Sequence, residues 1–312
     1  MVLLPALTVL ILAPEYFLPI RDFGTDYHAT LDGKNALKAI THIIDLPEQE
    51  RNESVEIAQW NENSTLNVTN LSLQYDESNE YSLKDISFSW KGFGKIGIIG
   101  ASGAGKSTLI NVLGGFAHPT SASIQINNET ITSFNTKEWQ QQVLYIPQHP
   151  YIFNDTLANN VSFYTPNATN EEIQQACHHA GLSTVIESLP NGLDERIGES
   201  GRALSGGQEQ RIAFARAFLD QSRKILLFDE PTAHLDIETE WELKQNILPL
   251  LDGRLVFFAT HRLHWMLEMD YIIVMDQGKI VETGTHEQLL KAKGTYTQLI
   301  QAQMHGTEEQ YG

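Results

Sequence analysis

The sequence predicts an α/β protein whose core is a parallel β-sheet, preceded by an antiparallel β part and carrying a helical insertion around residues 150–220. Three observations favour this fold class. Strand and helix patterns alternate along most of the chain, as they do in parallel sheets covered by helices. A glycine-rich loop joins the apolar stretch 95–99 to a helical pattern that begins at Lys106. A second apolar stretch, 225–228, ends in two acidic residues.

The expected strands and helices follow from the spacing of apolar residues. Segments 68–75 and 86–90 alternate apolar and polar residues, which is typical of strands buried on one face. The strands expected beyond them are 95–99, 123–126, 143–146, 225–228, 255–259 and 271–275. The expected helices, judged by helical periodicity, are 106–113, 171–180, 207–219, 238–247 and 286–292.

The N-terminal segment differs from this domain. Residues 1–14 carry no charged side chain, yet a bilayer span needs about 20 apolar residues. Helical spacing continues from Pro19 to about Glu50, with a turn at Leu46-Pro47. Two interpretations are open: a helix buried in the core, or the last part of a transmembrane helix whose start lies outside this sequence. The later motifs favour the second. The expected organisation is then 1–47 as the end of the last transmembrane helix and its cytoplasmic extension, 48–66 as a linker, 67–305 as one α/β domain and 306–312 as a tail.

Composition narrows the class of function. The formal net charge is −18, and a nucleic-acid-binding protein needs a basic surface, so nucleic acid is not an expected partner. Cys177 is the one cysteine, which excludes an intrachain disulfide and fits a reducing cytoplasm. The run Cys177-His178-His179 is not expected to bind a metal, because consecutive residues of a helix point about 100° apart.

The glycine-rich loop fits the pattern G-x-x-x-x-G-K-[ST] between a strand and a helix. Such a loop turns its N–H groups onto phosphate oxygens, and the helix N-terminus adds a favourable dipole. Lys106 is expected to reach the β- and γ-phosphates of ATP, and the Ser107 hydroxyl to bind Mg²⁺. The flanking strand and helix disfavour the alternative, a glycine turn without a ligand. The expected nucleotide contacts here are Gly100, Ala101, Ser102, Gly103, Ala104, Gly105, Lys106, Ser107 and Thr108.

Two carboxylates follow the apolar stretch 225–228. Strands of a parallel sheet deliver their C-terminal ends to the edge where ligands bind, which is also the edge of the phosphate loop. Asp229 is therefore expected to hold Mg²⁺, and Glu230 to orient or deprotonate the attacking water. Taken alone, the pair could equally be an ordinary solvated strand end.

The run Leu204-Ser205-Gly206-Gly207-Gln208 decides between these alternatives. It exposes backbone N–H groups at a helix N-terminus, which makes a second anion site. Together with the two motifs above, it resembles the signature of the ABC ATPase family. The resemblance implies that this segment contacts the γ-phosphate of ATP held by the opposite subunit, so that two domains close head-to-tail on two nucleotides.

Four further residues match family elements in family order, within residues 68–303. The resemblance implies that Tyr75 stacks on adenine, although a strand aromatic packed in the core is the alternative. It implies that Gln148 senses Mg²⁺ and the water, that His261 hydrogen-bonds the γ-phosphate and that Asp236 couples the two sites. Glu209 and His234 depart from the family pattern, because a basic and a small residue are usual there.

The kind of ABC protein follows from what surrounds these motifs. No heptad pattern lies between Lys106 and Ser205, which excludes the coiled-coil DNA-repair and chromosome-organising members. One cassette is present, whereas ribosome-associated members carry two. Gly198-Glu199-Ser200-Gly201 resembles the loop of exporters that contacts the partner's membrane domain, and His149-Pro150-Tyr151-Ile152-Phe153 resembles the surface that receives coupling helices.

The segment 12–29 resembles the end of the last membrane helix in the CydD family, one half of a bacterial thiol exporter needed for cytochrome bd assembly. The resemblance implies export of cysteine or glutathione, a CydC-like partner subunit and a place at the cytoplasmic face of the bacterial cell membrane. A homodimer is the alternative assembly. The alternative functions are an exporter-type ATPase with another substrate and a soluble ABC ATPase without a transport role.

Overall fold

The structure, a computed structural model, describes the chain except residues 1–2, 46–55, 76–79, 200, 234 and 312. The chain divides into two compact units, Met1–Arg51 and Asn52–Gly312. Each unit is described below by itself.

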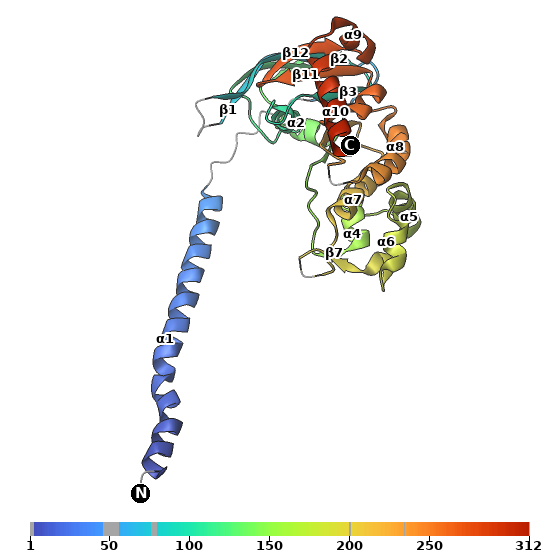
Figure 1. Cartoon of the computed structure of the whole chain (residues 1–312). Helices are drawn as coiled ribbons and strands as arrows, with labels where there is room; N and C mark the ends of the chain where they lie inside the picture. The colour runs from blue at the N-terminus through green and yellow to red at the C-terminus, as the bar shows by residue number, and fades with distance from the viewer. Residues whose placement is uncertain (1–2, 46–55, 76–79, 200, 234, 312) are drawn as a thin grey trace. The chain divides into compact units, whose positions relative to one another are not determined.

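The N-terminal unit consists of one helix, α1 (Leu3–Ile44), drawn in blue in Figure 1. It is 42 residues long and runs through Pro14 and Pro19 without interruption, so the uncharged start and the segment after Pro19 form one continuous helix. The turn expected at Leu46-Pro47 lies outside the described residues. Among the residues that the structure describes, no helix combines the length and the apolar character needed to cross a bilayer. Large apolar side chains of its N-terminal half are exposed, namely Leu7, Val9, Leu10, Ile11, Leu12, Phe17 and Ile20.

The second unit is built around a six-stranded sheet with the order β12-β11-β3-β10-β9-β6. Every neighbouring pair is parallel except β11 and β12, which form an antiparallel hairpin. The central strands are fully buried apolar runs, as expected where both faces of a parallel sheet are covered. The strands are β3 (Gly94–Ile99), β6 (Val143–Ile146), β9 (Ile225–Asp229), β10 (Leu255–Ala259), β11 (Tyr271–Asp276) and β12 (Lys279–Gly284).

A second, antiparallel sheet has the order β2-β1-β4-β5, as the alternating pattern predicted. Its strands are β1 (Thr65–Gln74), β2 (Tyr81–Lys91), β4 (Ser121–Ile126) and β5 (Glu129–Ile131). The structure places Trp60 and the start of β1 inside the segment expected to be a linker. Trp60 is 3% exposed, lies edge-on to Trp139, and donates its indole N–H to the carbonyl of Gly92 at 2.9 Å.

The helical insertion gathers on one side of the sheet (Figure 1). It contains α4 (Leu157–Val161), α5 (Asn170–His179), α6 (Ser183–Ser188), η1 (Gly192–Asp194) and α7 (Gly206–Leu219), with the short strands β7 (Asp155–Thr156) and β8 (Arg196–Ile197). Cys177 of α5 is fully buried, and burial raises the pKa of its thiol to about 12. The remaining helices are α2 (Lys106–Leu113), α3 (Lys137–Gln140), α8 (Ile237–Leu251), η2 (Leu263–Glu268), α9 (His286–Ala292) and α10 (Thr295–Tyr311).

The predicted fold class is therefore confirmed: a parallel core, an antiparallel β subdomain and a helical subdomain, preceded by a long helix. The predicted helices at 106–113 and 286–292 match α2 and α9 residue for residue. The prediction omitted the strands β5, β7, β8 and β12 and the helices α3, α4, α6, η1, η2 and α10. The two motifs predicted to bind a ligand follow β3 and β9, which belong to the same sheet with β10 between them.

Candidate functional site

The loop between β3 and α2 is shaped by its glycines. At Gly105 φ is +99°, a conformation that residues with a side chain rarely adopt. A Cβ at Gly100 would lie 2.2 Å from the carbonyl oxygen of Met275, so only glycine fits there. The first turn of α2 then begins directly at Lys106, with its free N–H groups facing the loop. The loop thus has the form expected of an anion cradle.

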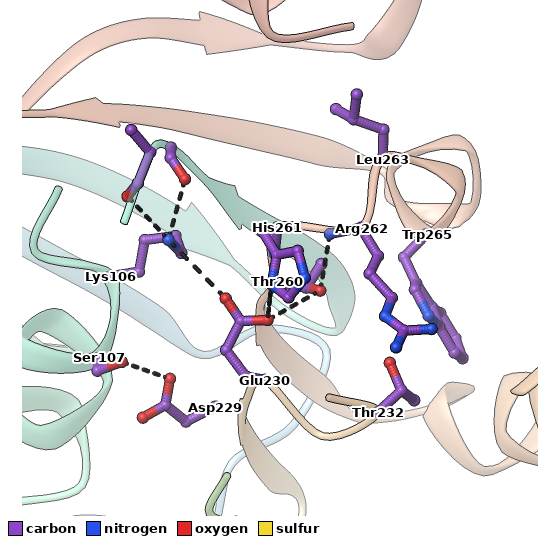
Figure 2. A network of polar contacts seen from close by, with 12 residues as sticks. Lys106, Ser107, Asp229, Glu230, Thr232, Thr260, His261, Arg262, Leu263 and Trp265 are labelled. Atoms are coloured by element: carbon purple, nitrogen blue, oxygen red, sulfur yellow. Dashed lines mark hydrogen bonds and ion pairs between the residues drawn. The ribbon is translucent and has the colours of Figure 1, made fainter. Parts of the chain in front are cut away.

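Lys106 projects into this cradle and is 7% exposed. Its ammonium donates to the carbonyls of Gly100 at 2.9 Å and Ala101 at 3.1 Å, and lies 3.8 Å from Oε1 of Glu230 (Figure 2). Burial lowers the pKa of Lys106, and the carboxylates of Glu230 and Asp229 partly offset this. A cation held in a poorly solvated place interacts strongly with an incoming phosphate, because little water screens the charge.

Ser107 and Asp229 form the second element of the site. The Ser107 hydroxyl donates to Oδ1 of Asp229 at 2.7 Å, which joins the start of α2 to the end of β9 (Figure 2). Burial raises the pKa of Asp229, the Ser107 hydrogen bond opposes that, and the neighbouring Glu230 charge adds to it. A hydroxyl and a carboxylate at hydrogen-bond distance are hard oxygen donors, so this pair fits Mg²⁺.

Glu230 follows Asp229 and has φ of +48°, which is rare for a residue with a side chain and is a form of strain found at functional sites. Its Oε2 accepts three hydrogen bonds: from Nδ1 of His261 at 2.7 Å, from the His261 N–H at 3.2 Å and from the Thr260 hydroxyl at 3.3 Å. Burial acts to raise the pKa of Glu230, but the His261 contacts and the Lys106 charge outweigh it and leave the pKa lowered. Glu230 is therefore an ionised base at neutral pH.

Lys106, Ser107, Glu230 and His261 line one open cleft of about 1210 Å³. Its lining includes Lys106, Ser107, Thr108, Gln148, Glu230 and His261, so the structure brings together predicted residues from four separate segments of the sequence. Tyr75 is not among the lining residues and is 47% exposed. The aromatic side chain that does line the cleft is Tyr81, at the start of β2.

Sequence reasoning missed two parts of this cleft, the segment Glu80–Ser82 at the start of β2 and the turn between β11 and β12. Gln277 and Gly278 line the cleft, and both have positive φ, +45° and +74°. The Gly278 N–H donates to the carbonyl of Ala104 at 3.1 Å, so the turn packs directly on the phosphate loop. The run Asp276-Gln277-Gly278 is recognisable as a turn, but nothing local shows what that turn contacts.

The predicted signature residues lie in a second pocket of about 480 Å³. Ser205 caps α7: its hydroxyl accepts from the Gln208 N–H at 3.3 Å, and Oε1 of Gln208 accepts from the Ser205 N–H at 3.0 Å. Asp236 caps α8 by accepting from the Thr239 N–H at 2.8 Å. Both helix N-termini therefore open into the same pocket, together with Gly206 and Gly207. Among the residues that the structure describes, none lines both this pocket and the cleft of Lys106.

Comparison with known proteins agrees with this geometry. The family described as "ABC transporter" matches residues 83–233. The CydC protein of Bacillus subtilis (strain 168), named as a glutathione/L-cysteine transport system ATP-binding/permease protein, is 54% identical over 300 residues, which is 96% of this chain and 52% of that protein. The transport ATP-binding protein AarD of Providencia stuartii is 33% identical over 96% of this chain and 50% of its own length.

A solved structure shows the same likeness. A bacterial Atm1-family ABC exporter with ATP bound superposes with a TM-score of 0.74 at 30% identity, over 93% of this chain and 50% of that one. The chain thus spans about half the length of the relatives it matches. The segment 12–29 had suggested the CydD half of a thiol exporter, whereas the relative with 54% identity carries the name of the CydC half.

Proposed function

This chain belongs to the ABC transporter family as an ATPase of the exporter type, and we propose that it supplies the ATP hydrolysis of an exporter for thiols such as glutathione or cysteine. One observation carries the proposal. Lys106, Gln148, Glu230 and His261, from four different segments, line a single cleft beside the Ser107–Asp229 pair. The substrate class rests on the name of the B. subtilis relative.

In the proposed mechanism, the loop N–H groups and Lys106 bind the phosphates of ATP. Ser107, Asp229 and Gln148 would hold Mg²⁺, which would supply positive charge against the phosphates. Glu230 is ionised, so it can accept a proton from the attacking water. Its carboxylate lies 3.8 Å from the ammonium of Lys106, which is the group that binds the phosphates in this mechanism. His261 holds Glu230 through the 2.7 Å contact of its Nδ1, and with both ring nitrogens protonated its Nε2–H can donate to the γ-phosphate.

The two separate pockets support a dimeric assembly. Lys106 and Ser205 line different pockets of the chain. The Ser205 pocket can therefore bind the nucleotide that is held by a second ABC subunit. A CydC/CydD-type heterodimer agrees with the relative's name, and a homodimer is the alternative. The exposed apolar side chains of α1 support attachment to a membrane domain at the cytoplasmic face of the cell membrane.

Hydrolysis as a function of protein concentration tests the proposal. We expect Mg²⁺-dependent phosphate release whose rate rises more steeply than linearly with concentration, because each site needs a second subunit. Lys106→Ala should abolish binding of a fluorescent ATP analogue. Lys91→Ala, which changes an exposed lysine at the end of β2, should leave binding unchanged. A rate linear in concentration down to high dilution would indicate a self-sufficient monomer and contradict the assembly.

A further inference from the structure

Glu240, on the first turns of α8, is a buried carboxylate outside both pockets. It is 1% exposed, and its two oxygens are fully engaged. Oε1 accepts from the Thr232 hydroxyl at 2.6 Å and from the Trp265 indole at 2.8 Å, and lies 3.4 Å from Nε2 of His264. Oε2 pairs with the guanidinium of Arg262.

The donors to Glu240 come from the two segments that carry the proposed chemistry. Thr232 lies two residues after Glu230, and Arg262 directly follows His261. Figure 2 shows Thr232, Arg262 and Trp265 together on one side of the Glu230–His261 contact. Glu240 therefore joins the segment after β9 to the loop after β10 at a point outside both pockets.

Arg262 extends this connection in two directions. Its guanidinium donates to the carbonyl of Leu235 at 3.0 Å, and Leu235 precedes Asp236. Its backbone N–H donates to the Thr260 hydroxyl at 3.0 Å, and that hydroxyl donates to Oε2 of Glu230 at 3.3 Å. A continuous set of hydrogen bonds thus runs from Glu240 to Glu230 on one side and to the backbone before Asp236 on the other.

We propose that Glu240 is a positioning residue for ATP hydrolysis, which holds the His261 loop and the segment after Glu230 in one fixed arrangement. Without its carboxylate, the buried donors of Thr232 and Trp265 and the Arg262 charge lose their common acceptor, and such groups are costly to leave unpaired. Arg262 is then free to turn towards solvent, and Thr260 and His261 lose their support. Glu230 and His261 remain present but lose their mutual alignment.

Glu240→Gln tests this, with Asp220→Asn as the matched control. Asp220 is also buried and paired with an arginine, Arg223, but its partners lie at the end of α7, away from both segments. We expect Glu240→Gln to lower kcat about tenfold, equivalent to 1.36 kcal/mol in the barrier, with KM for ATP within about threefold. Asp220→Asn should lower the melting temperature without changing kcat.

Two further experiments, a double-mutant cycle and amide hydrogen exchange, distinguish a positioning role of Glu240 from a general effect on the stability of the fold. If Glu240 acts through Arg262, the pair Glu240→Gln and Arg262→Met should lose no more activity than either change alone. Hydrogen exchange should become faster at Thr260–Arg262 in Glu240→Gln and stay unchanged there in Asp220→Asn. If Glu240→Gln does not fold, Thr232→Val replaces it in these experiments, because it removes one hydrogen bond to Glu240 at nearly constant side-chain shape. Thr232→Val should lower kcat and speed up amide exchange in the same direction, but to a smaller extent.

The proposal is overturned if kcat and the exchange of the His261 loop are unchanged in the Glu240 and Thr232 variants, or if Asp220→Asn loses as much kcat as Glu240→Gln. Amide hydrogen exchange can be measured whether or not the chain hydrolyses ATP. Absence of hydrolysis in the unaltered chain would therefore count against the proposed function, while the exchange result would still decide the role of Glu240.

Discussion

Replacing Glu230 by glutamine removes one negative charge and the proposed base while keeping the side-chain shape. A positioned general base contributes roughly 10²–10⁴-fold to a rate, so we expect kcat to fall by at least about 100-fold. Affinity for ATP should not fall with it. The lost carboxylate lies 3.8 Å from the Lys106 ammonium, where the attraction is about 4 kcal/mol at an effective dielectric constant of about 20. Its removal leaves Lys106 more available to the phosphates.

The assay combines steady-state phosphate release at saturating ATP with a separate titration of a fluorescent ATP analogue. Glu268→Gln is the control, because Glu268 is a partly exposed carboxylate that pairs with Lys244 and lines neither pocket. It should change neither quantity. Turnover of Glu230→Gln within about threefold of the unaltered chain would refute the role of Glu230. Loss of nucleotide binding as complete as in Lys106→Ala would refute the electrostatic argument.

Three further predictions concern stability and reactivity. The contacts of Glu240 hold its pKa at about 2 against an ordinary 4.5, so it stabilises the fold above pH 4.5 and the contribution is lost as pH falls towards 2. In urea unfolding, the advantage of the unaltered chain over Glu240→Gln should be roughly 3 kcal/mol at neutral pH and vanish near pH 2. In the same assay, Trp60→Ala should lower the free energy of unfolding by about 3–5 kcal/mol, because it leaves a cavity where the buried indole packs. A decrease below about 1 kcal/mol would show that Trp60 does not pack in the folded domain. Cys177 should react with a disulfide reagent at pH 8 only as the domain unfolds in urea; rapid reaction in the native state would contradict its burial.

The sequence predicts those parts of the site that depend on residues close together in the chain. The phosphate loop needs its glycines at fixed spacing, and Asp229 and Glu230 follow a buried strand directly, so their placement at one sheet edge follows from the parallel topology. The structure places them, with Gln148 and His261, around one cleft or in direct contact with it.

The parts that the sequence did not predict depend on contacts between distant residues. The Gln277 turn contacts the phosphate loop only because β11 pairs with β3. Glu240 is an acidic residue in the first turns of a helix, where most glutamates are exposed. It is buried against Arg262 and Trp265, which lie 22 and 25 positions away in the sequence. Trp60 is one aromatic residue in a polar stretch, so local composition indicated a linker although its indole packs in the domain.

The burial of Cys177 has a consequence for the proposed cargo. An exporter of low-molecular-weight thiols works beside molecules that exchange readily with any accessible thiolate or disulfide. The chain's one sulfhydryl is enclosed in the helical subdomain with its pKa raised to about 12, so it offers neither a nucleophile nor a surface to such partners. In the proposed thiol exporter, this ATPase would therefore not exchange disulfides with its cargo through Cys177.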